Sequence, residues 1–106
     1  LEGDVADPAL VRRAMEGVDG CFHLAAIASV ELGLRDWLGT HRVNLGGTIT
    51  VLDAARAGRV PVVYASSAAV YGEQARMPIT EAAVPRPLSS YGADKLGSEQ
   101  HARVAG

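Results

Sequence analysis

Two short apolar runs, separated by a long stretch with helical periodicity, constrain the fold of this chain more than any other feature. The runs are Gly20–Ala26 and Val60–Ala65, and neither alternates apolar with polar residues. Strands that are covered on both faces of a sheet have this pattern. Because strands that alternate with helices are typical of a parallel, doubly wound sheet, the sequence predicts an α/β fold of that kind. Two strands are too few for such a sheet, so we expect further strands from outside these residues.

The longest helical pattern lies between the two runs and predicts one helix over Arg35–Ala57. Apolar residues recur there at a spacing of three and four, and Gly58 is a natural C-cap. Gly46 and Gly47 weaken the pattern, since a glycine in a helix interior costs about 1 kcal/mol relative to alanine. Residues 27–34, which precede this helix, fit a loop or a weak helix equally well.

Shorter helices are predicted near both ends of the chain. The first begins after Asp7, a favoured N-cap that precedes a proline, and it ends at Gly17. The last covers residues 91–104, with either Ser89 or Ser90 as its N-cap. The stretch between the second apolar run and this last helix is rich in Pro, Gly and Ala, and it predicts a loop.

Composition and charge exclude several classes of protein. The chain has 106 residues and a formal net charge of −2, without the basic excess of a nucleic-acid-binding surface. The single cysteine, Cys21, allows no internal disulfide and is predicted to be a reduced core residue of a cytoplasmic protein. No apolar run approaches the roughly 18 residues that span a membrane. His23, His41 and His101 lack the paired spacing of metal ligands, so no metal site is expected.

Tyr91 and Lys95 are the first candidates for chemistry. Residues four apart on a helix lie on one face, one turn from each other. A phenol has a reference pKa near 10, so a base acting near neutral pH needs about 4 kcal/mol of preferential phenolate stabilisation. A neighbouring ammonium group supplies part of this stabilisation. By itself, however, the pair is more typical of a solvated helix face.

Ser66 and Ser67 are the second candidates. They directly follow the apolar run that ends at Ala65. The carboxyl ends of parallel strands are where open α/β folds place their ligands. A serine hydroxyl at this place could donate a hydrogen bond to a substrate oxygen, although Ser67 alone is more typical of an ordinary turn.

Together these residues resemble a known family. The string Tyr-Ala-Ser-Ser-Ala-Ala-Val-Tyr-Gly over residues 64–72, followed by Ser-Tyr-Gly-Ala-Asp-Lys over residues 90–95, is similar to the extended short-chain dehydrogenase/reductase family, and the resemblance covers essentially all 106 residues. It implies a Rossmann-like doubly wound sheet, NAD as cofactor, and a catalytic triad of Ser67, Tyr91 and Lys95. In that family the lysine also holds the nicotinamide ribose hydroxyls.

The resemblance extends to residues that contact the cofactor. Gly3-Asp4-Val5 resembles the family's Gly-Asp-(Ile/Val), whose aspartate bonds the adenine amine. The segment after His23, itself predicted to be a core histidine, resembles the strand end that passes beneath the pyrophosphate, where small residues allow close approach. Asn44 matches the family's Asn-x-x-Gly-Thr. The match implies that Gly46 and Gly47 allow the helix to pack tightly against the sheet. The implied cofactor-binding residues are Asp4, Val5, Leu24, Ala25, Ala26, Asn44, Ala65, Ser66, Tyr91 and Lys95.

The resemblance also implies that parts of the protein outside this sequence contribute to cofactor and substrate binding. The family's Gly-x-x-Gly-x-x-Gly turn, which cradles the pyrophosphate at a helix start, precedes the position of Asp4. We therefore interpret residues 1–106 as a fragment of one NAD(P)-binding Rossmann domain, without that turn and without the C-terminal substrate domain. Alone it is expected to be inactive and poorly folded. The full-length protein is expected to form a homodimer by pairing the helices over 35–57 and 91–104.

The residues after the second strand favour one reaction within the family. Dehydratases there resemble Thr-Asp-Glu or Thr-Ser-Glu, whereas this chain has Ala68 and Ala69, which cannot transfer a proton. The resemblance therefore implies an isomerase, an NAD-dependent sugar-nucleotide 4-epimerase of the UDP-glucose/UDP-galactose type that acts through a transient 4-keto sugar. The alternatives are another NAD(P)-dependent nucleotide-sugar epimerase, dehydratase or reductase of the family, or a non-catalytic dinucleotide-binding relative.

Overall fold

The two predicted strands pair in parallel in the computed structural model, which describes residues 1–106. β1 (Cys21–His23) lies beside β2 (Val62–Tyr64), with Cys21 opposite Val62 and His23 opposite Tyr64. The chain between them forms α2 (Val30–Arg35), α3 (Trp37–His41), a π-helical turn η1 (Arg42–Gly46) and α4 (Gly47–Gly58). This strand–helix–strand order with a parallel pair confirms the predicted α/β class.

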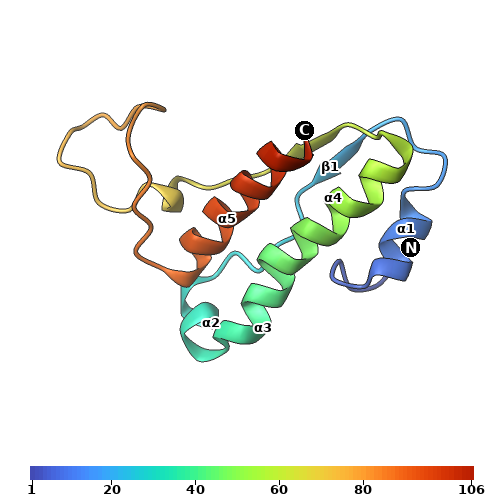
Figure 1. Cartoon of the computed structure of the whole chain (residues 1–106). Helices are drawn as coiled ribbons and strands as arrows, with labels where there is room; N and C mark the ends of the chain where they lie inside the picture. Colours follow the sequence, from blue (N-terminus) through green and yellow to red (C-terminus); the bar gives the residue numbers. More distant parts are fainter.

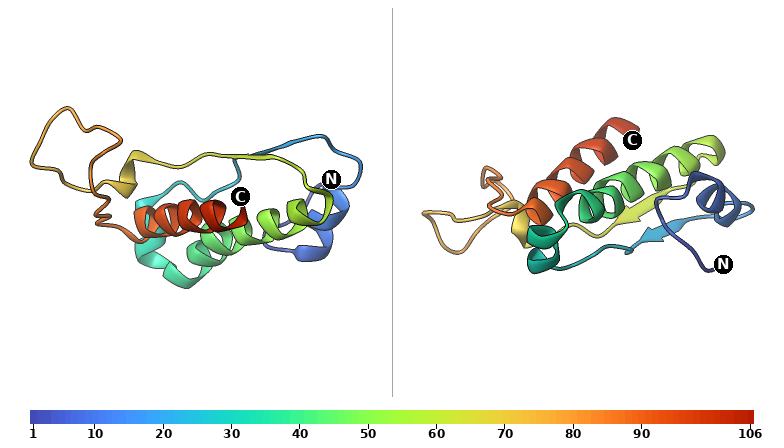
Figure 2. Two further views of the ribbon diagram at one scale, coloured as in Figure 1. Left: turned by 45° about the horizontal axis from the view of Figure 1, so that its top comes forward. Right: turned by 90° about the horizontal axis from the view of Figure 1, so that it is seen from below.

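Helices cover one face of this small sheet. In Figures 1 and 2, α4 and α5 (Ser90–Ala105) run side by side across it, and α1 (Pro8–Ala14) packs against α4. The apolar core joins these layers through Val11, Val51 and Ala54, with Cys21 and Val62 packed against it. None of the helices is both long and apolar enough to cross a membrane.

The other face of the sheet differs from the prediction. The apolar runs predict strands that are covered on both faces, yet Phe22 is 76% exposed and Val63 is 57% exposed. Successive side chains of a strand point to opposite faces. No element of residues 1–106 packs on the side to which Phe22 and Val63 point, so within this chain the sheet is covered on one face.

The helix ends show which local signals were decisive. The Asp7 carboxylate accepts hydrogen bonds from the backbone N–H groups of Ala9 and Leu10, which confirms it as the N-cap of α1. At the other end of α4, Gly58 is the last helical residue. Arg59 adopts the left-handed conformation there, with φ 52°, so the prediction of Gly58 as the cap is wrong by one residue.

The prediction of one helix over Arg35–Ala57 is wrong at its start and in its middle. Asp36 leaves helical geometry at φ −138° and ψ 71°, which separates α2 from α3. Its carboxylate accepts a hydrogen bond from Gly39 N–H and so begins a new helix at Trp37. The next five residues, Arg42–Gly46, form the wider π turn, after which α4 continues. Residues 30–35, left open by the sequence, are helical and are capped by Ser29.

Gly46 and Gly47 do not share the packing role predicted for them. A Cβ atom on Gly47 would lie 2.6 Å from Cγ1 of Val5, in the loop before α1. A Cβ atom on Gly46 would meet nothing within 4 Å. Close packing therefore explains Gly47 alone, and its neighbour is the Val5 side chain rather than the sheet.

Alanine at these two positions is expected to act in opposite directions. Gly47→Ala should lower the free energy of unfolding of the intact protein by about 1–3 kcal/mol, because Val5 must move. Gly46→Ala should raise it by up to about 1 kcal/mol, since alanine is the better helix former. Urea unfolding followed by circular dichroism measures both. Equal effects of the two substitutions would contradict the packing difference.

Candidate active site

The start of α5 places the Tyr–Lys pair beside the exit of β2. Ser89 Oγ accepts a hydrogen bond from Gly92 N–H at 3.0 Å, so Ser89 rather than Ser90 is the N-cap. A Cβ atom on Gly92 would lie 2.5 Å from the Ala69 carbonyl oxygen. The glycine between Tyr91 and Lys95 therefore lets the helix lie directly against the 3-10 turn η2 (Ala68–Val70).

Lys95 is buried next to Tyr91. Only 4% of Lys95 is exposed, and its Nζ donates a hydrogen bond to the Ala65 carbonyl oxygen at 2.8 Å. The same nitrogen lies 5.8 Å from the centre of the Tyr91 ring and 4.8 Å from that of Tyr64. Burial lowers the pKa of Lys95. The structure thus brings Tyr91, Lys95 and Ala65 together, three of the residues singled out in the sequence.

Ser67 lies at the turn that follows β2. It is half-buried, and its Oγ accepts a hydrogen bond from Ala69 N–H at 3.1 Å, which caps η2. It makes no hydrogen bond to Tyr91 or Lys95. The hydroxyl proton of Ser67 has no acceptor within the chain, so it is available to a substrate.

Ser66 is held by a residue that the sequence reasoning missed. Its Oγ donates a hydrogen bond to Oε1 of Glu99 on α5. Glu99 follows Lys95 by four residues, as Lys95 follows Tyr91, so all three lie along one side of the helix. That spacing was the available signal for Glu99. Its hydrogen bond to Ser66 connects α5 to the segment that leaves β2.

Asn44 holds the segment that leaves β1. The side chain is 2% exposed, its Oδ1 accepts from Ile27 N–H at 2.7 Å, and its Nδ2 donates to the Ile27 carbonyl at 3.1 Å. The amide is therefore directed at the backbone of Ile27. The backbone carbonyl oxygen of Asn44 also accepts hydrogen bonds from Thr48 Oγ1 at 2.8 Å and from Ser98 Oγ at 3.4 Å.

The segment fixed by Asn44 presents small and exposed side chains. Leu24 and Ala25 are exposed and Ala26 is half-buried. Ala65, at the end of β2, is half-buried as well, and in a parallel pair both strands end at the same edge. Four of the predicted cofactor-binding residues thus lie along one edge of the sheet.

Asp4 and Val5 lie in the loop before α1. The Asp4 carboxylate accepts hydrogen bonds from Ala6 N–H at 2.8 Å and from the Arg42 guanidinium at 2.6 Å. These contacts, the Ala6 bond above all, hold the pKa of Asp4 below its usual value. Val5 packs against the apolar core and against Gly47.

His23 is a core histidine, as predicted. It is buried and lies 3.0 Å from Thr48 Oγ1 through its Nε2. Because the Thr48 hydroxyl donates its proton to Asn44, His23 Nε2 must be the donor in this contact. Burial, with the charge of Lys95 as a second cause, lowers the pKa of His23 and keeps the ring neutral.

A second histidine makes a contact that no sequence signal indicated. His41 Nδ1 of α3 lies 2.6 Å from Oδ1 of Asp94 on α5. Asp94 is buried, and its other carboxylate oxygen has no hydrogen-bond partner. The pair links α3 to the residue that immediately precedes Lys95.

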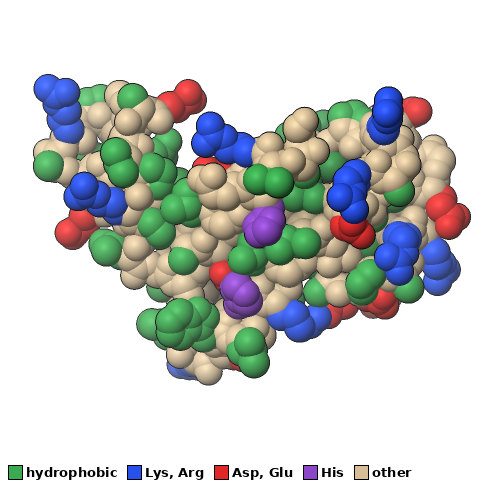
Figure 3. Space-filling model, viewed as in Figure 1, with side chains coloured by type: hydrophobic (Ala, Val, Ile, Leu, Met, Phe, Trp, Pro, Cys, Tyr) green, Lys and Arg blue, Asp and Glu red, His purple; other side chains and the backbone are tan.

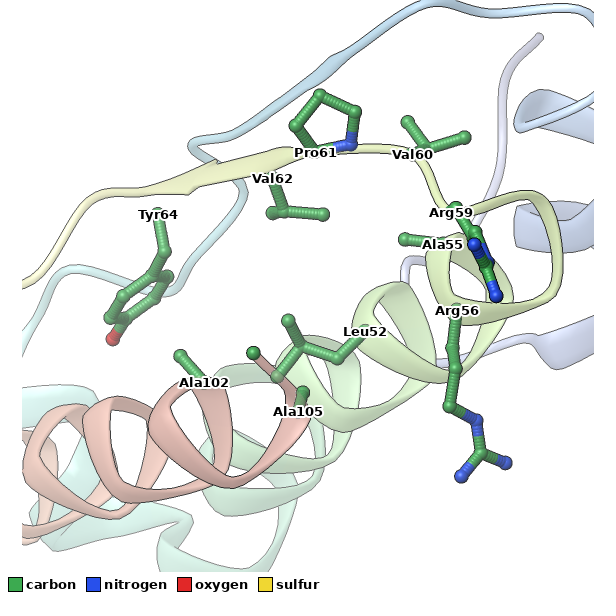
Figure 4. A pocket seen from close by; sticks show the side chains of 11 residues that line it. Leu52, Ala55, Arg56, Arg59, Val60, Pro61, Val62, Tyr64, Ala102 and Ala105 are labelled. Atoms are coloured by element: carbon green, nitrogen blue, oxygen red, sulfur yellow. The ribbon is translucent and has the colours of Figure 1, made fainter.

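One groove of the chain lies away from Ser67, Tyr91 and Lys95. It encloses about 340 Å³ between β2 and the C-terminal ends of α4 and α5, and Figure 4 shows the side chains along it. Tyr64 lines it, but Ser67, Tyr91 and Lys95 do not. The groove is therefore separate from the candidate active site.

Comparison with known proteins gives one consistent result. A sequence model of the NAD dependent epimerase/dehydratase family matches residues 1–106. A UDP-glucose 4-epimerase from Azospirillum brasilense is 39% identical over 109 residues, a match that covers 100% of this chain and 31% of the relative. The chain thus spans about a third of the length of the relatives that it matches.

Solved structures agree with the sequence match. UDP-glucose 4-epimerase from Brucella ovis, in complex with NAD, superposes with a TM-score of 0.88 at 38% identity over 94% of this chain and 32% of that one. A dTDP-glucose 4,6-dehydratase from Streptomyces venezuelae, with NAD bound, has a TM-score of 0.90 at 35% identity over 96% of this chain and 32% of that one. The same backbone therefore occurs in epimerases and in dehydratases.

The parallel sheet, its helical cover and the pair at its edge define a Rossmann-like α/β protein, as predicted. Within that class, the chain belongs to the NAD-dependent epimerase/dehydratase family. The family resemblance noted in the sequence is thereby confirmed.

The residues at the sheet edge fit the family's cofactor. Leu24 and Ala25 offer exposed apolar surface without bulky polar groups, and Ser66, whose hydroxyl donates to Glu99, is exposed beside them. Lys95 adds a cation that no carboxylate of the chain neutralises, since none of the ion pairs includes it. Apolar surface beside a fixed cation suits a flat, negatively charged dinucleotide.

Proposed function

We propose that the protein containing this chain is an NAD-dependent sugar-nucleotide 4-epimerase of the UDP-glucose/UDP-galactose type. One observation carries the proposal: the buried ammonium of Lys95 lies 5.8 Å from the ring of Tyr91, at the carboxyl end of a parallel strand. A nearby positive charge favours the ionised form of a phenol. Tyr91 therefore has a neighbour that favours its action as a base.

In the proposed reaction, Tyr91 removes the proton from the C4 hydroxyl of the sugar. Tyr91 acts in its phenolate form, which Lys95 stabilises, and becomes a phenol when it takes up the proton; the Ser67 hydroxyl donates a hydrogen bond to the C4 oxygen. NAD, when bound, supplies the acceptor for the C4 hydride. Loss of the hydroxyl proton and of the hydride leaves a 4-keto sugar. Return of the hydride to the opposite face and of the proton from Tyr91 gives the epimer.

The residues after Ser67 support epimerisation over dehydration. A dehydratase needs an additional acid and base at the substrate. Ala68 and Ala69 form the η2 turn at this place, and neither side chain can transfer a proton. The overall likeness to a dehydratase structure therefore concerns the backbone, whereas the side chains at the strand exit favour the simpler reaction.

The proposal assigns the remaining residues to binding. Lys95 and Tyr91 would hold the nicotinamide ribose, while Ala65, Ser66 and the segment from Leu24 to Ala26 would lie against the dinucleotide. Asn44 would support that segment through Ile27. Asp4 would bond the adenine amine beside Val5. On this proposal, residues 1–106 form the central part of one NAD-binding domain of a longer enzyme.

The test is an epimerase assay with the intact protein. The protein is incubated with UDP-galactose, and UDP-glucose is measured with a coupled dehydrogenase. Steady conversion without net oxidation of the sugar is expected. A folded, NAD-loaded protein that converts no UDP-galactose would exclude this substrate, and a 4-keto-6-deoxy product from a dTDP-sugar would replace the epimerase proposal with a dehydratase.

We also propose that the intact protein forms a homodimer through α3–α4 and α5. Apolar side chains lie on this helical face in Figure 3, and those exposed on α3, α4 and α5 include Trp37, Leu38, Ile49 and Val104. Light scattering should give twice the mass of one subunit. The double substitution Leu38→Glu and Ile49→Glu is expected to give a single subunit, and an unchanged mass would place the interface elsewhere.

A further inference from the structure

The Lys95 ammonium group is buried with little compensation from polar atoms. It has one hydrogen-bond acceptor, the Ala65 carbonyl oxygen, although an ammonium group carries several N–H donors. It takes part in no ion pair within the chain. A buried charge is costly unless it is paired or hydrogen-bonded. An aromatic face beside the ammonium group would help to hold Lys95 in this position.

The ring of Tyr64 lies where such a group is needed. Its centre is 4.8 Å from Lys95 Nζ, within the range of a cation–π interaction. Tyr64 is the last residue of β2 and directly precedes Ala65. The last residue of the strand and the residue after it thus supply the aromatic face and the carbonyl oxygen that receive the ammonium group.

The Tyr64 ring is itself fixed from the side of β1. His23 stacks on it with 5.8 Å between ring centres and 28° between planes. His23 is in turn held by its hydrogen bond to Thr48. The aromatic face under Lys95 therefore has a set orientation, built from both strands and α4.

The Tyr64 hydroxyl has no comparable role. It points toward α5 in Figure 4, is buried, and makes no hydrogen bond in the chain. Burial is the main cause that raises the pKa of Tyr64; the nearby Ser98 hydroxyl opposes this effect, and the negative charge of Glu99 adds to it. Only the ring contacts the ammonium group, so phenylalanine should serve equally well at this position.

We propose that Tyr64 is a positioning residue for Lys95: its ring, fixed by His23, holds the ammonium group against the Ala65 carbonyl and beside Tyr91. The inference rests on the proposed function in one respect, that Lys95 is the group on which Tyr91 depends. It goes beyond that function because it assigns the placement of the lysine to an aromatic ring that has no role in the proposed reaction.

The experiment follows Lys95 directly in the intact protein. Lysine labelled with carbon-13 at Cε gives one NMR signal per lysine, and the signal lost in Lys95→Arg is assigned to Lys95. Its titration is compared in wild type, Tyr64→Phe and Tyr64→Leu. Tyr64→Phe should keep the titration midpoint of the wild type, whereas Tyr64→Leu should lower it by about one pH unit, because the ring no longer stabilises the cation.

Activity gives a second readout of the same contact. Tyr64→Leu should lower kcat by about tenfold and shift the pH–rate profile. Tyr64→Phe should keep the kcat and the pH–rate profile of the wild type. Circular dichroism checks that each variant is folded. If Tyr64→Leu fails to fold, Tyr64→Met replaces it, because methionine fills the site without an aromatic face.

Two outcomes would overturn the inference. One is a Lys95 titration in Tyr64→Leu, or in its methionine substitute, that matches the wild type. The other is a Tyr64→Phe variant as impaired as Tyr64→Leu, which would assign the role to the hydroxyl. Because the NMR titration needs no substrate, it tests Tyr64 even if UDP-galactose proves to be the wrong substrate.

Discussion

Tyr91→Phe is expected to lower kcat for UDP-galactose epimerisation by about 10²–10⁴-fold, the usual contribution of a positioned acid–base group. The substitution removes the phenol oxygen and leaves the ring beside Lys95. NAD binding and the fold should therefore persist, which separates a lost base from a lost structure. Initial rates at saturating substrate, with circular dichroism of both proteins, provide the measurement.

Tyr71→Phe is the matched control for this experiment. It removes the same atom from a tyrosine that lies in the loop after η2, outside the Tyr91–Lys95 contact. Its kcat should stay close to that of the wild type. Equal losses in the two variants would argue against Tyr91 as the base, as would a Tyr91→Phe enzyme with undiminished rate.

Asn44→Ala is expected to have the largest effect on stability. It removes both hydrogen bonds to Ile27 and leaves the partly buried N–H and C=O groups of that residue without partners. An unsatisfied group of this kind costs about 1–3 kcal/mol, so the free energy of unfolding should fall by roughly 2–4 kcal/mol. NAD affinity should fall as well, because the segment from Leu24 to Ala26 loses its support. Urea unfolding and calorimetric titration with NAD measure the two effects.

Two companion variants sharpen this prediction. Asn44→Asp keeps the acceptor for Ile27 N–H but turns an oxygen toward the Ile27 carbonyl, so it should lose much of the same stability. Thr50→Ala removes a hydroxyl that donates only to Gly46 within the same helical stretch, and it should be nearly neutral. If Asn44→Ala lowered the free energy of unfolding as little as Thr50→Ala, the two hydrogen bonds from Asn44 to Ile27 would not contribute to stability.

Local signals made most of the elements predictable from the sequence. Apolar runs gave both strands, and side-chain caps such as Asp7 and Ser89 gave helix starts, since each signal acts within a few residues. The break at Asp36 was missed because a single residue outweighed the apolar spacing around it. The π turn was missed because its period differs only slightly from that of an α-helix.

The site was predictable where spacing alone determines proximity. Tyr91 and Lys95 lie one turn apart on any helix, so their contact needed no tertiary information. His41 and Asp94 are 53 residues apart, and nothing in the sequence indicates that α3 and α5 would meet there. The stack of Tyr64 under Lys95 was missed for the same reason, since it depends on how a strand and a helix cross.

The burial of Lys95 has a consequence for chemical labelling. Lys95 is the only lysine among residues 1–106, and 4% of the residue is exposed. We expect an acylating reagent to modify it slowly, and more slowly still when NAD is bound, because Lys95 is proposed to hold the nicotinamide ribose. The acylation rate at this position, read by peptide mass analysis, would therefore report how far bound NAD covers the lysine.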